Sequence, residues 1–292
     1  MGLADKFRLL LEGSKLDVNR RFELMREAIS GTMSKFYMAK DRQTGEVFGL
    51  KVCNKQKTDY FENRFAGLNK PSEGEIASQF DHPLIVTTFK YGKTTEGEDY
   101  VLMEYLEGSG LNSLILHQSE KLNGVRARLI QQIVEALQVV HEAGFIHRDV
   151  CPRNFIASPD ATSIKLIDFG LTVPALPLFM QPGNRTGTPN YMAPEIVRRR
   201  KTDKRLDLFA FGVTAFQLLT LELPWPGVDV TGKAAMAHDA MPPREIFELR
   251  PKLDRTLGNA IKACLSVQPE NRPDSFESFR RMINGVTEEE EP

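Results

Sequence analysis

The chain has few cysteines and no pattern that would pair them. Cys53, Cys151 and Cys264 are the only three in 292 residues, and they lie far apart along the sequence. An odd number without paired spacing argues against a disulfide-stabilised secreted fold and against a structural zinc site. We therefore expect a reduced, cytoplasmic protein.

Long apolar runs are missing as well. The most apolar stretch, Leu208 to Leu221, contains Thr214 and Gln217. It is shorter than the roughly 20 residues that a membrane-spanning helix needs. The N-terminus lacks the apolar run of a signal peptide, and Lys6 stands where a myristoylation motif has Ser or Thr. We expect a soluble protein without membrane insertion.

Neither sign of charge is in excess. The 38 Lys and Arg residues nearly balance 39 Asp and Glu residues, for a formal net charge of -1. A protein that binds nucleic acid over its whole surface needs a net basic field, so we expect no nucleic-acid partner. The basic run 198–201 is interpreted as a solvated loop or a contact for acidic substrates. The acidic run 288–291 is interpreted as a solvated or a docking tail.

The pattern of residues changes along the chain, and 41% hydrophobic residues are enough for a buried core. Residues 1–21 are expected to be a lead-in, and residues 283–292 an acidic tail. Between them we predict an α+β fold, with a small β-rich unit over 22–106 and a larger helical unit over 107–282. Strands are expected at 22–30, 35–41, 46–52, 85–91 and 100–105, and helices at 71–80 and 125–143.

Two short polar motifs carry the strongest chemical signal. The first is H-R-D-V-C-P-R-N, which contains Asp149 and Asn154, and the second is D-F-G, which begins at Asp168. One carboxylate can accept a hydroxyl proton, while an amide oxygen and a second carboxylate can bind a metal that bridges phosphate oxygens. The alternative is an ordinary hairpin with Asp at its turns.

These motifs resemble those of the eukaryotic-type protein kinase family over residues 22 to 282. Three further segments agree in order and spacing: G-T-P-N-Y-M-A-P-E at 187–195, D-L-F-A-F-G at 207–212 and P-E-N-R-P at 269–273. The resemblance implies a two-lobed kinase fold with ATP in the cleft. It also implies an ion pair between Arg272 and Glu195.

The resemblance assigns the nucleotide-binding residues. Lys51 takes the position of the ATP lysine, and an exposed strand lysine is the alternative. Counting back from His82-Pro83 gives Glu73 as its carboxylate partner, with Glu75 as the fallback. The remaining ATP contacts that the resemblance implies are Gly31, Met103, Glu104, Leu106 and Ile156.

The phosphate-binding loop departs from the family. Ile29, Gly31 and Ser34 occupy its three glycine positions, so only one glycine remains and we expect weaker ATP binding. Phe36 replaces a small β-branched residue over the adenine, and Gly49 replaces the usual alanine. We expect the Phe36 ring to use the space that Gly49 leaves.

The catalytic loop departs as well. Cys151 stands where serine/threonine kinases carry lysine, and Arg153 stands where many tyrosine kinases carry arginine. Thr188 is in a segment of the serine/threonine style and is expected to touch Asp149. Thr186 is the candidate phosphorylation site, and an unregulated segment is the alternative.

The resemblance implies a Mg²⁺- and ATP-dependent protein kinase that acts on Ser/Thr hydroxyls of a protein substrate; Tyr is not excluded. Asp149 would accept the hydroxyl proton, Asn154 and Asp168 would hold Mg²⁺, and Arg153 would offset charge on the transferred group. A pseudokinase that acts as a binding module is the main alternative. A small-molecule phosphotransferase is the other.

Overall fold

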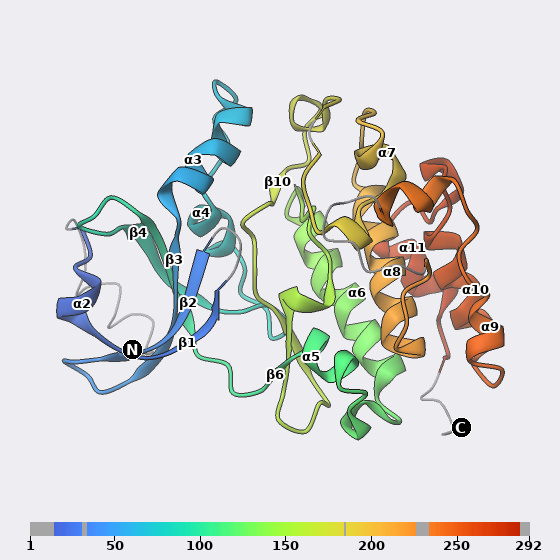
Figure 1. Ribbon diagram of the computed structural model, residues 1–292, viewed down its shortest axis with the longest axis horizontal. Helices are drawn as coiled ribbons and strands as arrows, with labels where there is room; N and C mark the ends of the chain where they lie inside the picture. The colour runs from blue at the N-terminus through green and yellow to red at the C-terminus, as the bar shows by residue number, and fades with distance from the viewer. Residues whose placement is uncertain (1–14, 31–33, 184, 226–233, 287–292) are drawn as a thin grey trace. The chain divides into compact units, whose positions relative to one another are not determined.

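The computed structural model describes residues 15–30, 34–183, 185–225 and 234–286. The chain divides into two compact units, Met1–Glu107 and Gly108–Pro292. The first unit is built on strands and the second mainly on helices (Figure 1). The predicted α+β class is confirmed.

The first unit contains a five-stranded antiparallel sheet with the order β1-β2-β3-β5-β4. Its strands are β1 (Phe22–Ser30), β2 (Ser34–Asp41), β3 (Val47–Cys53), β4 (Thr88–Lys93) and β5 (Asp99–Glu104). The predicted turn joins β2 to β3: Asp41 Oδ1 accepts the Gln43 and Thr44 N–H groups, and Gly45 has φ 77°. That left-handed backbone conformation favours glycine.

One face of this sheet forms a hydrophobic core that reaches beyond the strands. Phe48 and Leu50 of β3 pack with Phe22 and Leu102, and Leu16 joins them with 5% of its surface exposed. The Leu16 N–H also donates to the Lys93 carbonyl. Residues 15–21, part of the expected lead-in, are therefore integral to the first unit, because their apolar side chains complete its core.

The described residues of this unit form three helices: α2 (Val18–Arg21), α3 (Lys55–Glu62) and α4 (Glu73–Ala77). Helix α4 is shorter than the predicted 71–80. Ser72 caps its first turn, and Ser78 ends it as the C-cap.

The second unit is mainly helical. Its helices are α5 (Leu111–Leu116), α6 (Arg126–Glu142), α7 (Pro194–Val197), α8 (Arg205–Thr220), α9 (Ile246–Leu249), α10 (Arg255–Cys264) and α11 (Phe276–Met282). Helix α8 runs beside α6 and α10 and is buried on nearly all sides (Figure 1). This central helix supports the loops that carry the polar motifs. None of the described helices is long and apolar enough to cross a membrane.

Short strands hold the motif-bearing loops of this unit. They are β6 (Ser109–Gly110), β7 (Phe145–Ile146), β8 (Phe155–Ala157), β9 (Ile164–Leu166) and β10 (Val173–Pro174). Strands β7 and β8 flank the loop 147–154, and β9 leads to Asp168. Because β8 pairs antiparallel with β9, Asn154, which immediately precedes β8, and Asp168, which follows β9, lie at the same end of this ladder.

Candidate active site

Lys51 and Glu73 form an ion pair inside the first unit. Lys51 Nζ lies 2.5 Å from Glu73 Oε1, and Lys51 has only 3% of its surface exposed. Its ammonium also lies 5.3 Å from the centre of the Phe36 ring, which is opposite Lys51 in the β2–β3 ladder. The exposed strand lysine is thus ruled out, and the buried ammonium has a carboxylate partner.

Glu75, the fallback partner, has a different task. Its carboxylate accepts the Ser72 N–H at 2.7 Å, while the Ser72 hydroxyl accepts the Glu75 N–H at 3.3 Å. This reciprocal capping box satisfies two N–H groups at the start of α4. Glu73, the first residue of the same helix, is left to face Lys51.

A close approach between α4 and β4 sets the place of that helix turn. A Cβ added to Gly74 would lie 2.2 Å from the Tyr91 Cβ, far inside van der Waals contact. Glycine is therefore required beside Glu73, because any side chain would push the helix away from the strand.

The prediction that the Phe36 ring uses the space beside Gly49 is wrong. A Cβ on Gly49 would lie 3.0 Å from Met103 Cγ and 3.1 Å from the Glu104 carbonyl oxygen, whereas Phe36 is not among its nearest neighbours. Gly49 is directly opposite Met103 in the β3–β5 ladder, so the space is used by Met103 instead of Phe36. Met103 is buried, with 6% exposure.

The other predicted nucleotide contacts are spread over both units. The Glu104 carboxylate accepts the Thr87 N–H at 2.7 Å, so this side chain is tied to its own unit. Leu106 follows β5 and is half-buried, and Ile156 is the half-buried centre of β8 in the second unit. Gly31 lies outside the described residues.

Asp149 is held by two neighbours in the second unit. One carboxylate oxygen accepts both the N–H and the hydroxyl of Thr188, each at 2.8 Å. Asn154 Nδ2 donates to the Asp149 carbonyl at 2.7 Å and to its other carboxylate oxygen at 3.2 Å. The predicted contact between Thr188 and Asp149 is confirmed, and the carboxylate is oriented on both sides.

Arg153 and Cys151 meet the same threonine. Arg153 Nη2 donates to Thr188 Oγ1 at 2.9 Å, and Cys151 Sγ lies 3.6 Å from that oxygen. Burial, reinforced by the charge of Asp149, raises the pKa of the Cys151 thiol to about 12. Cys151 is therefore neutral near pH 7, whereas Arg153 of the same loop carries a positive charge.

The buried carboxylate of Asp207 in α8 holds the loop 147–154 in place. Asp207 accepts the N–H groups of His147 and Arg148 at 2.8 Å, and His141 Nε2 lies 2.8 Å from it. Arg148 has φ 68°, a strained value that these bonds stabilise. Burial raises the pKa of Asp207, but the hydrogen bond and charge of His141, with the other donors, lower it on balance.

Sequence reasoning did not single out His141. The sequence feature that could have indicated it is the position of His141 in helix α6, one turn after the buried Leu137. A polar ring on a buried helix face needs a hydrogen-bond partner.

Asn154 and Asp168 carry oxygen atoms suited to a metal. Since Asn154 donates its amide nitrogen to Asp149, its side-chain oxygen points the other way. Asp168 Oδ1 accepts the Gly170 N–H at 2.9 Å. Among the described residues no three His, Cys, Asp or Glu side chains form a metal site alone. The side chains of Asn154 and Asp168 both offer the oxygen ligands that a divalent cation takes.

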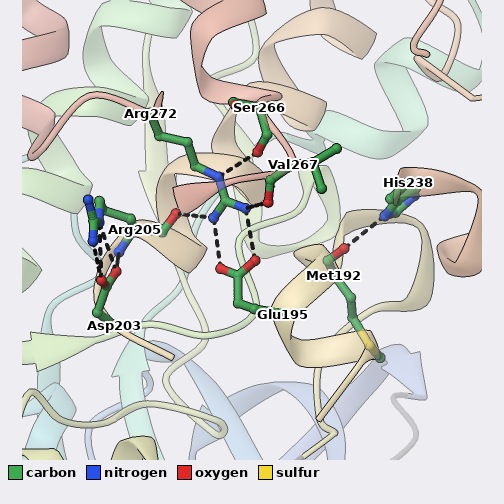
Figure 2. Close-up of polar contacts among 8 residues, drawn as sticks. All are labelled: Met192, Glu195, Asp203, Arg205, His238, Ser266, Val267 and Arg272. Carbon is green, nitrogen blue, oxygen red and sulfur yellow. Dashed lines mark hydrogen bonds and ion pairs between the residues drawn. The ribbon is translucent and has the colours of Figure 1, made fainter. Parts of the chain in front are cut away.

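The predicted ion pair between Arg272 and Glu195 is confirmed (Figure 2). The guanidinium makes two parallel bonds to the carboxylate, at 2.7 and 2.8 Å. It also donates to the carbonyl groups of Ser266, Arg205 and Val267. This bond set secures α7, which follows the Thr188 segment.

Trp225 and Thr186, two further residues singled out in the sequence, are both described by the structure. Trp225 is 4% exposed and donates to the Met241 carbonyl at 2.9 Å, as expected for a packing anchor. The Thr186 hydroxyl is buried without a hydrogen-bond partner among the described residues. Phosphorylation of Thr186 would therefore require this part of the segment to open.

The comparison with protein families matches residues 22–282 to the protein kinase domain. The chain belongs to the protein kinase family.

Several curated proteins are similar over most of the chain. Serine/threonine-protein kinase pkn3 of Myxococcus xanthus is 30% identical over 272 residues, covering 89% of this chain and 48% of the relative. AtPK1/AtPK6 of Arabidopsis thaliana is 29% identical, covering 92% and 54%. PrkC of Bacillus subtilis is 28% identical, covering 91% and 40%. The chain spans about half or less of the length of these relatives.

Proposed function

We propose that this chain is an ATP-dependent serine/threonine-protein kinase that acts on a protein substrate in the cytoplasm. The observation that carries the proposal is the orientation of Asp149 by Thr188 and Asn154. An acid held in this way suits the acceptance of a hydroxyl proton. The serine/threonine class is supported by the names of the similar proteins.

Each polar residue has a role in the proposed reaction. Asp149 aligns the acceptor hydroxyl and takes its proton as the hydroxyl oxygen attacks the γ-phosphorus. The bond from this phosphorus to the oxygen that bridges it to the β-phosphate breaks, and ADP leaves. Lys51, held by Glu73, binds the phosphate oxygens of ATP. Asn154 and Asp168 would hold Mg²⁺, which neutralises charge on the phosphates when bound. Arg153 offsets negative charge near Asp149. The Cys151 thiol is neutral and cannot take this role.

The pseudokinase alternative is less well supported. A binding module gains nothing from a buried Lys51–Glu73 pair or from an oriented Asp149, and buried charges are costly unless they are paired. A small-molecule phosphotransferase is also disfavoured, because Gly187 to Glu195 resembles a peptide-docking segment.

Phosphoamino-acid analysis tests the proposal. The protein is incubated with a degenerate Ser/Thr/Tyr peptide library, radiolabelled ATP and Mg²⁺. We expect phosphoserine and phosphothreonine, and no transfer by Asp168→Asn. Transfer to tyrosine alone would overturn the serine/threonine assignment. The absence of transfer from folded, ATP-binding protein would favour the pseudokinase.

A further inference from the structure

His238 is a buried histidine that the proposed reaction does not use. It lies in the 3-10 segment η6 (Ala234–Asp239) with 2% of its surface exposed. Its Nδ1 lies 2.8 Å from the Met192 carbonyl oxygen (Figure 2). Since a carbonyl only accepts, Nδ1 must carry the proton. Burial lowers the pKa of His238, which favours the neutral ring with its proton on Nδ1.

Aromatic rings fix the orientation of this imidazole. The ring centres of His238 and Trp225 are 4.4 Å apart, and those of His238 and Phe209 are 5.5 Å apart. Phe209 belongs to the central helix α8 and stacks on Trp225. A phenylalanine could fill the same space, so packing alone does not require a polar ring here.

Asp239, the next residue of η6, contacts Arg198, six positions after Met192. Asp239 accepts two bonds from the Arg198 guanidinium, at 2.6 and 2.7 Å. Residues 192–198 are therefore attached to η6 at both ends, and the Arg272–Glu195 pair secures them in the middle.

Met192 lies near Gly187, as does Asp149, the proposed proton acceptor. The Met192 Cγ lies 3.6 Å from the position that a Cβ on Gly187 would take, and Asp149 Oδ1 lies 3.9 Å from that same point. The Met192 side chain and the Asp149 carboxylate thus both lie beside Gly187, while the Met192 carbonyl is bound by His238. A movement of the Met192 backbone would change the surface that an acceptor peptide meets beside Asp149.

We propose that His238 is a positioning residue for the protein substrate, because its bond to the Met192 carbonyl fixes the end of the segment 187–195 that resembles a peptide-docking surface. The inference rests on the proposed kinase function. His238 belongs to the same unit as Asp149 and has no part in binding ATP, so its loss should weaken peptide binding selectively.

The test compares His238→Phe, which keeps a ring and loses the donor, with His238→Asn, which keeps a donor near Nδ1. Exposed His117 provides the control His117→Asn. Steady-state kinetics use a degenerate Ser/Thr peptide library, and ATP hydrolysis without peptide reports the nucleotide site. We expect His238→Phe to raise the peptide KM about tenfold, with the KM for ATP and the hydrolysis rate unchanged. His238→Asn should recover part of the loss.

An unchanged peptide KM in folded His238→Phe would overturn the inference, as would an equal rise in the KM for ATP. If His238→Phe does not fold, Asp239→Asn provides the second measurement, because it breaks the Arg198 pair at the surface. Its peptide KM should rise by a smaller factor, and no rise would also overturn the inference. Failure of the unsubstituted protein to phosphorylate any library peptide would instead contradict the kinase function.

Discussion

Arg153 and Asp149 are joined through a single hydroxyl group. The Arg153 guanidinium donates to Thr188 Oγ1 at 2.9 Å, and this hydroxyl donates to Asp149 Oδ1 at 2.8 Å. The positive charge therefore acts on the acceptor carboxylate along a chain of two hydrogen bonds. We propose that Arg153 supplies the positive charge that the neutral Cys151 does not provide.

Removal of this cation should slow the chemical step. Arg153→Ala is expected to reduce kcat by roughly 10²-fold, with little change in the KM for ATP, because the interaction matters most as charge develops. Single-turnover kinetics measure the step. Cys151→Ala is the matched control and should be nearly silent. Full kcat in both Arg153→Lys and Arg153→Ala would show that Arg153 has no such role.

Thr188 gives an independent measure of the same chain of bonds. Thr188→Val removes the hydroxyl and should slow transfer, since Arg153 and Asp149 then lose their shared group. A double-mutant cycle with Arg153→Ala should be clearly non-additive. Additive losses would mean that Arg153 acts on the phosphate without Thr188.

Substitution of the two glutamates of α4 should affect different properties, activity for Glu73 and stability for Glu75. Glu73→Ala leaves the buried Lys51 ammonium without its carboxylate, so kcat/KM should fall on the order of 10²-fold. Glu75→Ala removes a helix cap and should cost about 1 kcal/mol of unfolding free energy with kcat retained. Urea unfolding and steady-state kinetics measure both. A larger activity loss in Glu75→Ala would reverse the assignment of the two acids.

The reduced glycine content of the phosphate-binding loop should affect ATP affinity. The double substitution Ile29→Gly and Ser34→Gly should lower the KM for ATP several-fold, equivalent to about 1 kcal/mol of binding. Glycine permits backbone approach to phosphates that Ile29 resists. The measurement is the KM for ATP at saturating peptide. An unchanged or higher value would show that the loop does not limit binding.

The lowered pKa of Asp207 implies that the stability of the folded protein depends on pH. Because the pKa of Asp207 is lowered in the folded protein, its contribution is complete above the unfolded value near 3.9 and is lost as the pH falls through the folded value. Asp207→Asn should lose about 3 kcal/mol at pH 7, and its difference from the unsubstituted protein should narrow in acid. Urea unfolding at pH 7 and at about pH 2, below the unfolded pKa, tests this. The exposed Asp81→Asn should show neither effect.

Sequence patterns were sufficient where spacing along a motif determines the contact. The Arg272–Glu195 pair and the Thr188–Asp149 bond follow from such motifs. Four of the five strands of the first unit start within one residue of the expected position, whereas β4 begins at Thr88 instead of Ile85. The neighbour of Gly49 was missed because it depends on which β5 residue lies opposite in the sheet.

Two further features depend on contacts between distant segments. Apart from its capping box, which is a local pattern of Ser72 followed three residues later by Glu75, the start of α4 is set by the approach of Gly74 to Tyr91. The bond from His238 to Met192 joins residues separated by 46 positions. Neither contact leaves a local signature in the sequence.

The five N–H groups of Arg272 are all used, two on Glu195 and three on backbone carbonyls. Lysine has only three donors on a single nitrogen, so no other natural side chain can replace this set. A substitution at Arg272 would leave a buried carboxylate and several carbonyls unsatisfied. In a living cell its consequence would be seen first as accelerated degradation and a smaller pool of protein, even though Arg272 touches no reacting atom.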